Sequence, residues 1–207
     1  MNNKSLVFVL VIFAWILTAC TSTSVSSTSM PTSGAGMDVD QMFIDMMVPH
    51  HQAAIEMALL AQQKAEHPEL KQMADQIIAD QEREVGQLKT WRQQWYGSDV
   101  TPPMSEMPML SNMAAMGHES MTMDMTADIE KLKTTSEPFD LVFIDLMIGH
   151  HQMAVDAGKM AEQQATREEV RDLARMIVEN QQKEIEQMEA WRLEWYGSAD
   201  VSATPTP

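Results

Sequence analysis

The sequence has a single cysteine, Cys20, so it can form neither an internal disulfide nor a metal site built from several thiolates. Basic residues are also few, with 14 lysines and arginines against 30 acidic residues. The net charge of −16 argues against nucleic acid as a partner, because phosphate binding needs a basic face. Aromatic residues make up 6% of the chain, whereas methionine occurs 21 times. Soft-metal chemistry would therefore have to use thioethers and imidazoles.

The N-terminal segment is predicted to be a targeting sequence. Lys4 precedes an apolar run over residues 6–17, which is short for a membrane span and typical of a signal peptide, predicted over 1–19. The tetrapeptide Leu-Thr-Ala-Cys ending at Cys20 resembles a bacterial lipobox, which would make this cysteine the lipidated first residue of the mature chain. A plain secretory signal is the alternative. The expected location is the bacterial cell envelope outside the cytoplasm, with membrane contact through the lipid anchor only, or a secreted or periplasmic protein without it.

The rest of the chain contains an internal repeat. Residues 40–98 and 140–198 align without a gap and are identical at 24 of 59 positions. Apolar residues recur at intervals of three and four in two successive segments of each copy, which predicts an antiparallel pair of helices. Pro68 is suited to begin a second helix, and Gly97 and Gly197 to end the second helices. Two such hairpins predict an all-α, ferritin-like four-helix bundle.

The domain organisation follows from this repeat and from changes in composition. At the start of the last helix, Thr166 and Glu169 have the spacing of a capping box. The predicted parts are a signal peptide (1–19), a lipidated cysteine with a flexible Ser/Thr tether (20–37), helical hairpin 1 (38–98), a methionine-rich connection with a short helix (99–137), helical hairpin 2 (138–198) and a disordered tail (199–207).

A Met-x-x-His-His motif occurs once in each copy, one hundred residues apart. On a helix the methionine and the histidines share a face, so thioether and imidazole converge. This donor set favours a soft ion such as Cu(I) or Ag(I), with Cu(II) as the further alternative. Copper is the expected metal, and no organic cofactor is expected. The predicted metal ligands are Met47, His50, His51, Met147, His150 and His151.

Further polar residues accompany the histidines on otherwise apolar helix stripes. Counted from the hairpin turn near residue 67, His50, His51, Gln81 and Glu84 fall at one level, and the second copy repeats this. Such a layer needs either internal hydrogen bonds or a cation, so a purely structural network of His, Gln and Glu is the alternative to a metal site. The possible additional metal ligands or supporting groups are Met46, Asp45, Asp145, Gln81, Glu84, Gln181 and Glu184.

The connection between the hairpins is rich in methionine without a helical stripe. This composition favours a flexible Cu(I) or Ag(I) site, although a hydrophobic flap or a sink for oxidants would have the same composition. The candidate ligands in this methionine-rich loop are Met104, Met107, Met109, Met113, Met116, His118, Met121, Met123 and Met125.

The motif F-I-D-x-M-x-x-H-H, followed by Q-x-x-E and W-x-x-x-W-Y-G, resembles the bacterial family called domain of unknown function 305 (DUF305), in two tandem copies. The resemblance implies a secreted or lipid-anchored four-helix protein of the ferritin-like, copper-binding type. We expect an extracytoplasmic protein for copper sequestration, tolerance or homeostasis, whose partners are metal ions and unidentified copper-handling proteins.

Two other functions remain open. A ferritin-like di-iron oxidase or peroxidase would need Glu-x-x-His pairs, and the chain has none. The protein is therefore not expected to be an enzyme. A structural envelope lipoprotein without metal is the third possibility.

Overall fold

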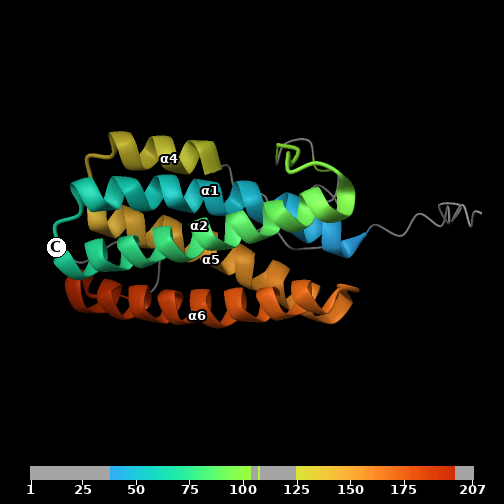
Figure 1. Ribbon diagram of the computed structural model, residues 1–207. Helices are drawn as coiled ribbons and strands as arrows, with labels where there is room; N and C mark the ends of the chain where they lie inside the picture. The colour runs from blue at the N-terminus through green and yellow to red at the C-terminus, as the bar shows by residue number, and fades with distance from the viewer. Residues whose placement is uncertain (1–37, 104–106, 108–124, 199–207) are drawn as a thin grey trace, which may run out of the picture. The chain divides into compact units, whose positions relative to one another are not determined.

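The computed structural model describes residues 38–103, 107 and 125–198. These residues form helices and no strand, which confirms the predicted all-α class (Figure 1). None of the described helices is long and apolar enough to cross a membrane. Cys20, the tether and the C-terminal tail lie outside the described residues. The helices are α1 (Val39–Lys64), α2 (Pro68–Tyr96), α4 (Met125–Thr134), α5 (Phe139–Gln164) and α6 (Glu168–Tyr196).

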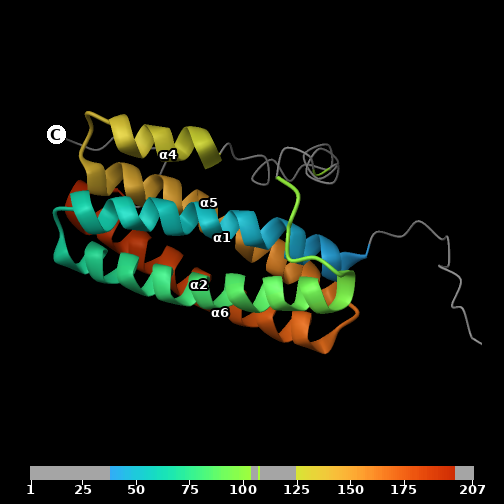
Figure 2. The ribbon, with the colours of Figure 1, turned by 45° about the horizontal axis from the view of Figure 1, so that its top comes forward.

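Two helical hairpins make up the bundle. Helix α1 packs along α2, α5 packs along α6, and the hairpins meet where α1 lies against α5 (Figure 2). Pro68 is the first residue of α2, where its missing N–H is not needed. Gly97 and Gly197 end α2 and α6 with φ angles of 81° and 79°, a left-handed conformation that glycine adopts without steric cost. These local predictions are confirmed.

Each hairpin turn is bound by an aspartate from the start of the other hairpin. The Asp140 carboxylate accepts hydrogen bonds from the backbone N–H groups of Glu66 (3.0 Å) and His67 (2.9 Å), and His67 Nδ1 lies 2.7 Å from it. Asp40 accepts in the same way from the backbone N–H of Thr166 (3.0 Å) and from its hydroxyl. The start of each long inner helix therefore lies beside the end of the other, so α1 and α5 run antiparallel.

This arrangement contradicts the capping box predicted from Thr166 and Glu169. Helix α6 begins at Glu168 with Arg167 as its N-cap, and no side chain caps it. The Thr166 hydroxyl donates instead to Asp40, which lies 126 residues away in the sequence. The prediction is wrong because a carboxylate from the other hairpin takes the hydroxyl that local spacing assigned to the helix N-terminus.

The opposite end of each hairpin is closed by an ion pair. Arg92 Nε donates to Asp45 Oδ1 at 2.5 Å, and Arg192 Nε donates to Asp145 Oδ1 at the same distance. Both arginines also donate through Nη1 to the backbone carbonyl of the serine that follows the capping glycine, Ser98 and Ser198 respectively. The arginine of the repeated Trp-Arg sequence thus ties the last turn of the second helix to the first helix.

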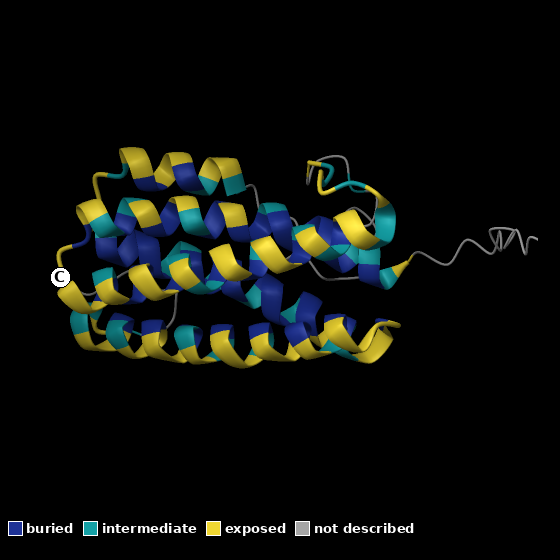
Figure 3. Cartoon of the chain, viewed as in Figure 1, coloured by how far each residue is buried: buried dark blue, intermediate teal, exposed yellow. Residues whose placement is uncertain are grey.

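Apolar side chains fill the interior, and the outward faces of the helices are exposed (Figure 3). Phe43 and Phe143 are fully buried in separate clusters, one in each half of the bundle. Burying one such side chain stabilises the fold by about 1.5–3 kcal/mol. Helix α4 lies alongside α1, where Leu132 is fully buried and Lys64 Nζ donates to the carbonyls of residues 132 and 133.

Candidate metal centre

Four histidines form a buried layer where α1 and α5 cross. His50 and His51 lie on α1, His150 and His151 lie on α5, and each is at most 1% exposed. The rings of His50 and His150 face one another across the two hairpins, with centroids 3.7 Å apart and planes inclined by 34°. The two Met-x-x-His-His motifs therefore form one layer, which follows from the antiparallel crossing of α1 and α5.

A glutamate from the second helix of each hairpin meets one histidine of this layer. His51 Nε2 lies 2.7 Å from Glu84 Oε2 and hydrogen-bonds to it. His151 Nε2 also lies 2.7 Å from Glu184 Oε2, but this contact lacks hydrogen-bond geometry. The Glu84 side chain is 7% exposed and that of Glu184 is 18% exposed. The level predicted by counting from the hairpin turns is thus the level at which these side chains meet.

Most ring nitrogens in the layer have no hydrogen-bond partner among the described residues. His50 Nε2 lies 3.1 Å from the backbone carbonyl of His150, and His51 Nε2 meets Glu84, but the Nδ1 atoms of both rings are unpartnered. Nδ1 of His150 and Nδ1 of His151 are unpartnered as well, whereas His151 Nε2 has the Glu184 carboxylate 2.7 Å away. A buried polar atom without a partner costs free energy, so the purely structural network of His, Gln and Glu is not satisfied by protein groups alone.

The hydrogen bonds of the first hairpin fix which nitrogens can bind a metal. A carbonyl and a carboxylate only accept, so Nε2 of His50 and of His51 must carry the hydrogen. The lone pair then resides on Nδ1 of each ring, which is the unpartnered atom. A carboxylate that holds the far nitrogen of a ligating histidine is a common support for metal binding in proteins. The geometry of His51 and Glu84 fits that arrangement.

Burial keeps the two central histidines neutral. It lowers the pKa of His50 well below the usual imidazole range, and the charges that His150, His51 and His151 would carry lower it further. Burial likewise lowers the pKa of His150, with smaller contributions from His151 and His51. Because only neutral imidazole coordinates a metal, these two rings stay available as ligands in acid better than an exposed histidine would.

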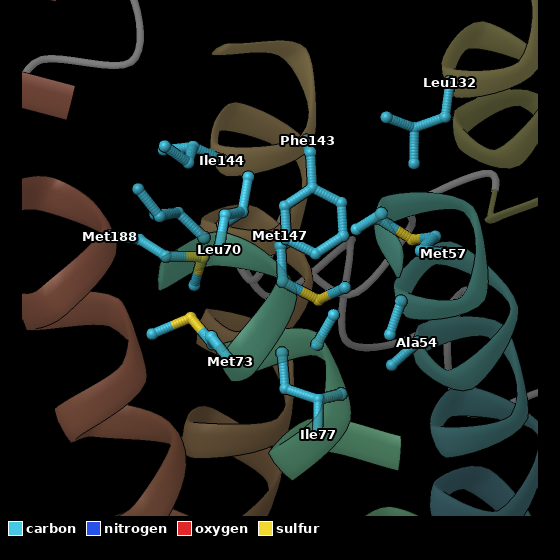
Figure 4. Packing of buried hydrophobic residues seen from close by; sticks show 14 of the residues in the cluster. Ala54, Met57, Leu70, Met73, Ile77, Leu132, Phe143, Ile144, Met147 and Met188 are labelled. Atoms are coloured by element: carbon cyan, nitrogen blue, oxygen red, sulfur yellow. The ribbon is translucent and has the colours of Figure 1, made fainter. Parts of the chain in front are cut away.

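The methionines of the motif lie one helical turn before the histidines and are fully buried. Met147 packs in the apolar cluster that contains Met57 and Phe143 (Figure 4). Met47 packs in the other cluster, together with Met46. The predicted thioether ligands thus flank the histidine layer from the two apolar halves of the bundle.

The other predicted site residues divide into two groups. Gln81 and Gln181 are each 3% exposed, lie one turn from Glu84 and Glu184, and have no hydrogen-bond partner for either amide atom among the described residues. Asp45 and Asp145 are instead held by arginines, as described above. The sequence analysis missed those arginines. Their signal was the spacing of 47 residues between aspartate and arginine, which is the same in both copies.

The layer as it stands is not a carboxylate-rich metal site. Within the described ranges, no group of three or more His, Cys, Asp or Glu side chains is arranged to hold a metal ion. Metal binding by the layer would therefore draw on thioethers or on small side-chain movements. Of the methionine-rich loop only Met107 and Met125 are described, and both pack against the apolar cluster of Phe43. The other loop candidates lie outside the described residues, namely Met104, Met109, Met113, Met116, His118, Met121 and Met123.

The chain was compared with known families and structures. The family model described as domain of unknown function (DUF305) matches residues 40–192. A search of curated proteins found no match. The structure of CopM in the Cu(I)-bound form is 42% identical, covers 76% of this chain and 98% of its own, and superposes with a TM-score of 0.63. CopM in the Cu(II)-bound form is 46% identical over 76% of this chain and 97% of its own, with a TM-score of 0.63.

More distant structures have the same fold. A DUF305 protein from Streptomyces coelicolor is 25% identical, covers 82% of this chain and 98% of its own, and has a TM-score of 0.63. The likeness therefore extends over nearly the whole length of each of these relatives.

Proposed function

The chain belongs to the DUF305 family, and from that premise we propose that it binds copper, in the bundle, to hold the metal outside the cytoplasm. CopM has been crystallised with Cu(I), Cu(II) and silver, which supports a copper-related function for a chain of 42–46% identity. The observation that carries the proposal is the histidine layer, where the Nδ1 atoms of all four buried rings have no hydrogen-bond partner among the described residues.

In this proposal the ligands of each site are one thioether and two imidazoles. Met47, His50 and His51 bind one ion, and Met147 with its two histidines binds another. Thioether sulfur and neutral imidazole are soft or borderline donors, which favours Cu(I) and Ag(I) over hard divalent ions. Glu84 supports the first site by holding His51 Nε2, so that Nδ1 faces the metal.

The test is a Cu(I) titration of the mature protein against a competing chelator. The Met47→Leu/Met147→Leu variant keeps side-chain volume and should fold normally. We expect it to bind Cu(I) about 10-fold to 100-fold more weakly than the wild type, by analogy with the loss of supporting groups at metal sites. Met73→Leu is the matched control, because it removes a buried thioether from the same apolar cluster as Met147 but from α2, outside the motif. Equal affinities in all three proteins would contradict the proposal.

Removal of the imidazoles is the second arm of this test. His50, His51, His150 and His151 are replaced by alanine, and circular dichroism checks that the bundle still forms. The variant should lose the tight sites altogether. If the folded variant kept them, the ligands would have to lie elsewhere.

We propose that the protein acts by binding and not by catalysis. A di-iron enzyme of the ferritin type needs several carboxylates around two ions. In the described part of the chain, only Glu84 and Glu184 meet the histidine layer. Asp45 and Asp145 are committed to arginines. Oxygen-dependent turnover by purified, iron-loaded protein would contradict this view.

We also propose that the methionine-rich loop adds weaker Cu(I) capacity, and that Cys20 carries a lipid anchor in the cell envelope. Both rest on sequence, since flexible thioethers must be ordered on binding and so bind more weakly per ion. Replacing residues 108–124 by a Gly/Ser linker should reduce the number of Cu(I) ions bound without weakening the tight sites. Cys20→Ala should release the protein from the membrane fraction, which cell fractionation measures. Mass spectrometry of the mature N-terminus should detect the lipid on the wild type and not on the variant.

A further inference from the structure

Two buried glutamines are not accounted for by a site made only of imidazoles and thioethers. Gln81 on α2 and Gln181 on α6 are each 3% exposed. In both, the amide nitrogen and the amide oxygen lack a hydrogen-bond partner among the described residues. Each glutamine precedes by three residues the glutamate that meets a histidine, and residues so spaced share a helix face. Gln81 and Gln181 therefore belong to the polar layer by position.

Packing alone does not explain an amide at these positions. The nearest buried apolar residues on the same stripe are Ile77 and Leu88 around Gln81, with the buried Glu84 between them, and Ile177 and Ile185 around Gln181. A leucine would continue these stripes, whereas a buried amide with unmet hydrogen bonds costs about 1–3 kcal/mol. The cost occurs twice, once in each hairpin. A ligand that uses the amides would offset it.

The chemistry of an amide narrows the choice of ligand. Its oxygen accepts and its NH₂ group donates, whereas a thioether-bound Cu(I) ion offers neither a donor nor an acceptor. Cu(II) differs, because it prefers nitrogen and oxygen ligands in a tetragonal geometry. A water molecule bound to Cu(II) donates hydrogen bonds, which a glutamine oxygen can accept. Gln81 and Gln181 thus have a use in the oxidised state that they lack in the reduced one.

We propose that Gln81 and Gln181 are positioning residues for a water molecule that completes the coordination of Cu(II) at the histidine layer. The inference rests on the proposed function. It adds that the same histidine layer binds copper in two oxidation states with different additional ligands. Imidazoles and thioethers bind Cu(I), and imidazoles with an amide-held water bind Cu(II). The relative affinity for the two ions then depends on two residues that need not touch the metal.

The experiment compares Cu(II) and Cu(I) binding in the full mature protein, each with its own competing chelator. In Gln81→Leu/Gln181→Leu the Cu(II) affinity should fall about 10-fold to 100-fold, whereas the Cu(I) affinity should change little. Each tenfold fall of the Cu(II) affinity relative to the Cu(I) affinity raises the reduction potential of the bound Cu(II)/Cu(I) couple by about 59 mV. Proton couplings from an exchangeable water on Cu(II), seen by electron–nuclear double resonance, should disappear. The metal-free variant should unfold at the same or a higher temperature.

Matched controls come from the repeat itself. Gln87 and Gln187 are exposed on the same two helices, and Gln87→Leu/Gln187→Leu should leave both affinities unchanged. A second variant, Gln81→Asn/Gln181→Asn, keeps the amide but withdraws it by one methylene, and a partial loss of Cu(II) affinity is expected. This variant decides the question if the leucine variant fails to fold.

Three results would overturn the inference. The first is an equal loss of Cu(I) and Cu(II) affinity in the leucine variant, which would make the glutamines general supports of the layer. The second is an unchanged affinity for both ions, which would mean that the amides bind only a structural water. The third is a wild-type protein that binds neither ion, and in that case the proposed function fails too. A wild type that binds both ions separates the first two results from a failure of the proposed function.

Discussion

The two hairpins have the same fold but do not hold their histidines in the same way. In the first hairpin, each histidine has one ring nitrogen hydrogen-bonded, His50 to a carbonyl and His51 to Glu84. In the second hairpin the corresponding contacts are less well aligned, because His151 Nε2 lies 2.7 Å from Glu184 without hydrogen-bond geometry and His150 has only an interaction with the His50 backbone. Rings that are held need less reorganisation to bind a metal, so we expect the first site to be the tighter one.

The residues around the histidines also differ between the copies. Position 49 is proline in the first copy, where it lies inside α1 and cannot donate a backbone hydrogen bond, and the corresponding residue of the second copy is glycine. Glu84 is also more buried than Glu184. The duplication therefore supplies an internal control, because each change can be made in one hairpin and compared with its counterpart in the other.

The largest expected difference concerns the ion pairs that close the hairpins. Arg92→Met leaves the Asp45 carboxylate, which is 12% exposed, without its cation. Breaking a buried pair in this way costs about 3–5 kcal/mol. Arg192→Met should cost less, because Asp145 is 26% exposed and can be hydrated. Urea unfolding of both variants measures the two costs, and an equal or reversed order would show that exposure of the carboxylate does not decide them.

Acidification should destabilise the metal-free protein through the central histidines of both hairpins. Burial lowers the pKa of His50 and His150, so the folded state keeps them neutral while the unfolded chain binds a proton at each below about pH 6.5. The unfolded state then holds more protons. Stability is complete above that pH and falls below it by up to about 1.4 kcal/mol per pH unit for each histidine.

This dependence is measured by urea unfolding at pH 7.5, 6.5 and 5.5. The His50→Gln/His150→Gln variant should show a smaller slope, because glutamine does not titrate. Gln87→Leu is the control, since Gln87 is exposed on α2, outside the layer, and does not titrate. If the double variant kept the full slope, carboxylates and not these histidines would control acid stability.

The unequal glutamate contacts predict unequal metal affinities. Glu84→Gln removes the carboxylate that fixes His51, and should weaken the first Cu(I) site about 10-fold. Glu184→Gln should have a smaller effect, because its contact with His151 lacks hydrogen-bond geometry. Competition titrations on the two single variants provide the measurement. A larger loss in Glu184→Gln would reverse the assignment of the tighter site.

The smallest expected effect is at the contact between the helices of each hairpin. A Cβ atom on Gly158 would lie 2.6 Å from Val178 Cγ2 and 3.2 Å from the Ala174 carbonyl. The clash outweighs the helix propensity that alanine gains, so Gly158→Ala should destabilise by about 1 kcal/mol. The first hairpin has alanine at this position, and Ala58→Gly should also cost about 1 kcal/mol because glycine is a poor helix former. Thermal unfolding checks both, and a stabilised Gly158→Ala would show that Val178 moves freely.

Local rules predicted the helices and the level of the polar layer well. Helices rise by a constant amount per residue, so counting from the turn placed Glu84 opposite His51. The sequence pattern proposed Asp45 as a further ligand or supporting group, but it could not identify Arg92 as the partner of Asp45. That pairing depends on how the last turn of α2 folds back.

Contacts between the hairpins were beyond the reach of the sequence pattern. Asp40 lies in the first turn of a helix, where an acidic residue is favourable in any case, and nothing local indicates that it binds a turn of the other hairpin. The contact of the His50 ring with the His150 ring depends likewise on where α1 and α5 cross. Periodicity gives the face of a helix but not the register of two helices separated by a long connection.

Asp40 and Asp140 leave each hairpin incomplete on its own, because each turn needs a carboxylate that only the other hairpin supplies. Two copies of a single hairpin could make the same contacts as a symmetric homodimer, with one self-complementary interface. Joining the copies in one chain replaces a concentration-dependent encounter by an intramolecular one. It also removes the requirement that both halves be identical, so that proline and glycine, or His67 and Arg167, can occupy equivalent positions. Covalent fusion thus leaves the two halves of the bundle, and the two sites that we propose in them, free to diverge.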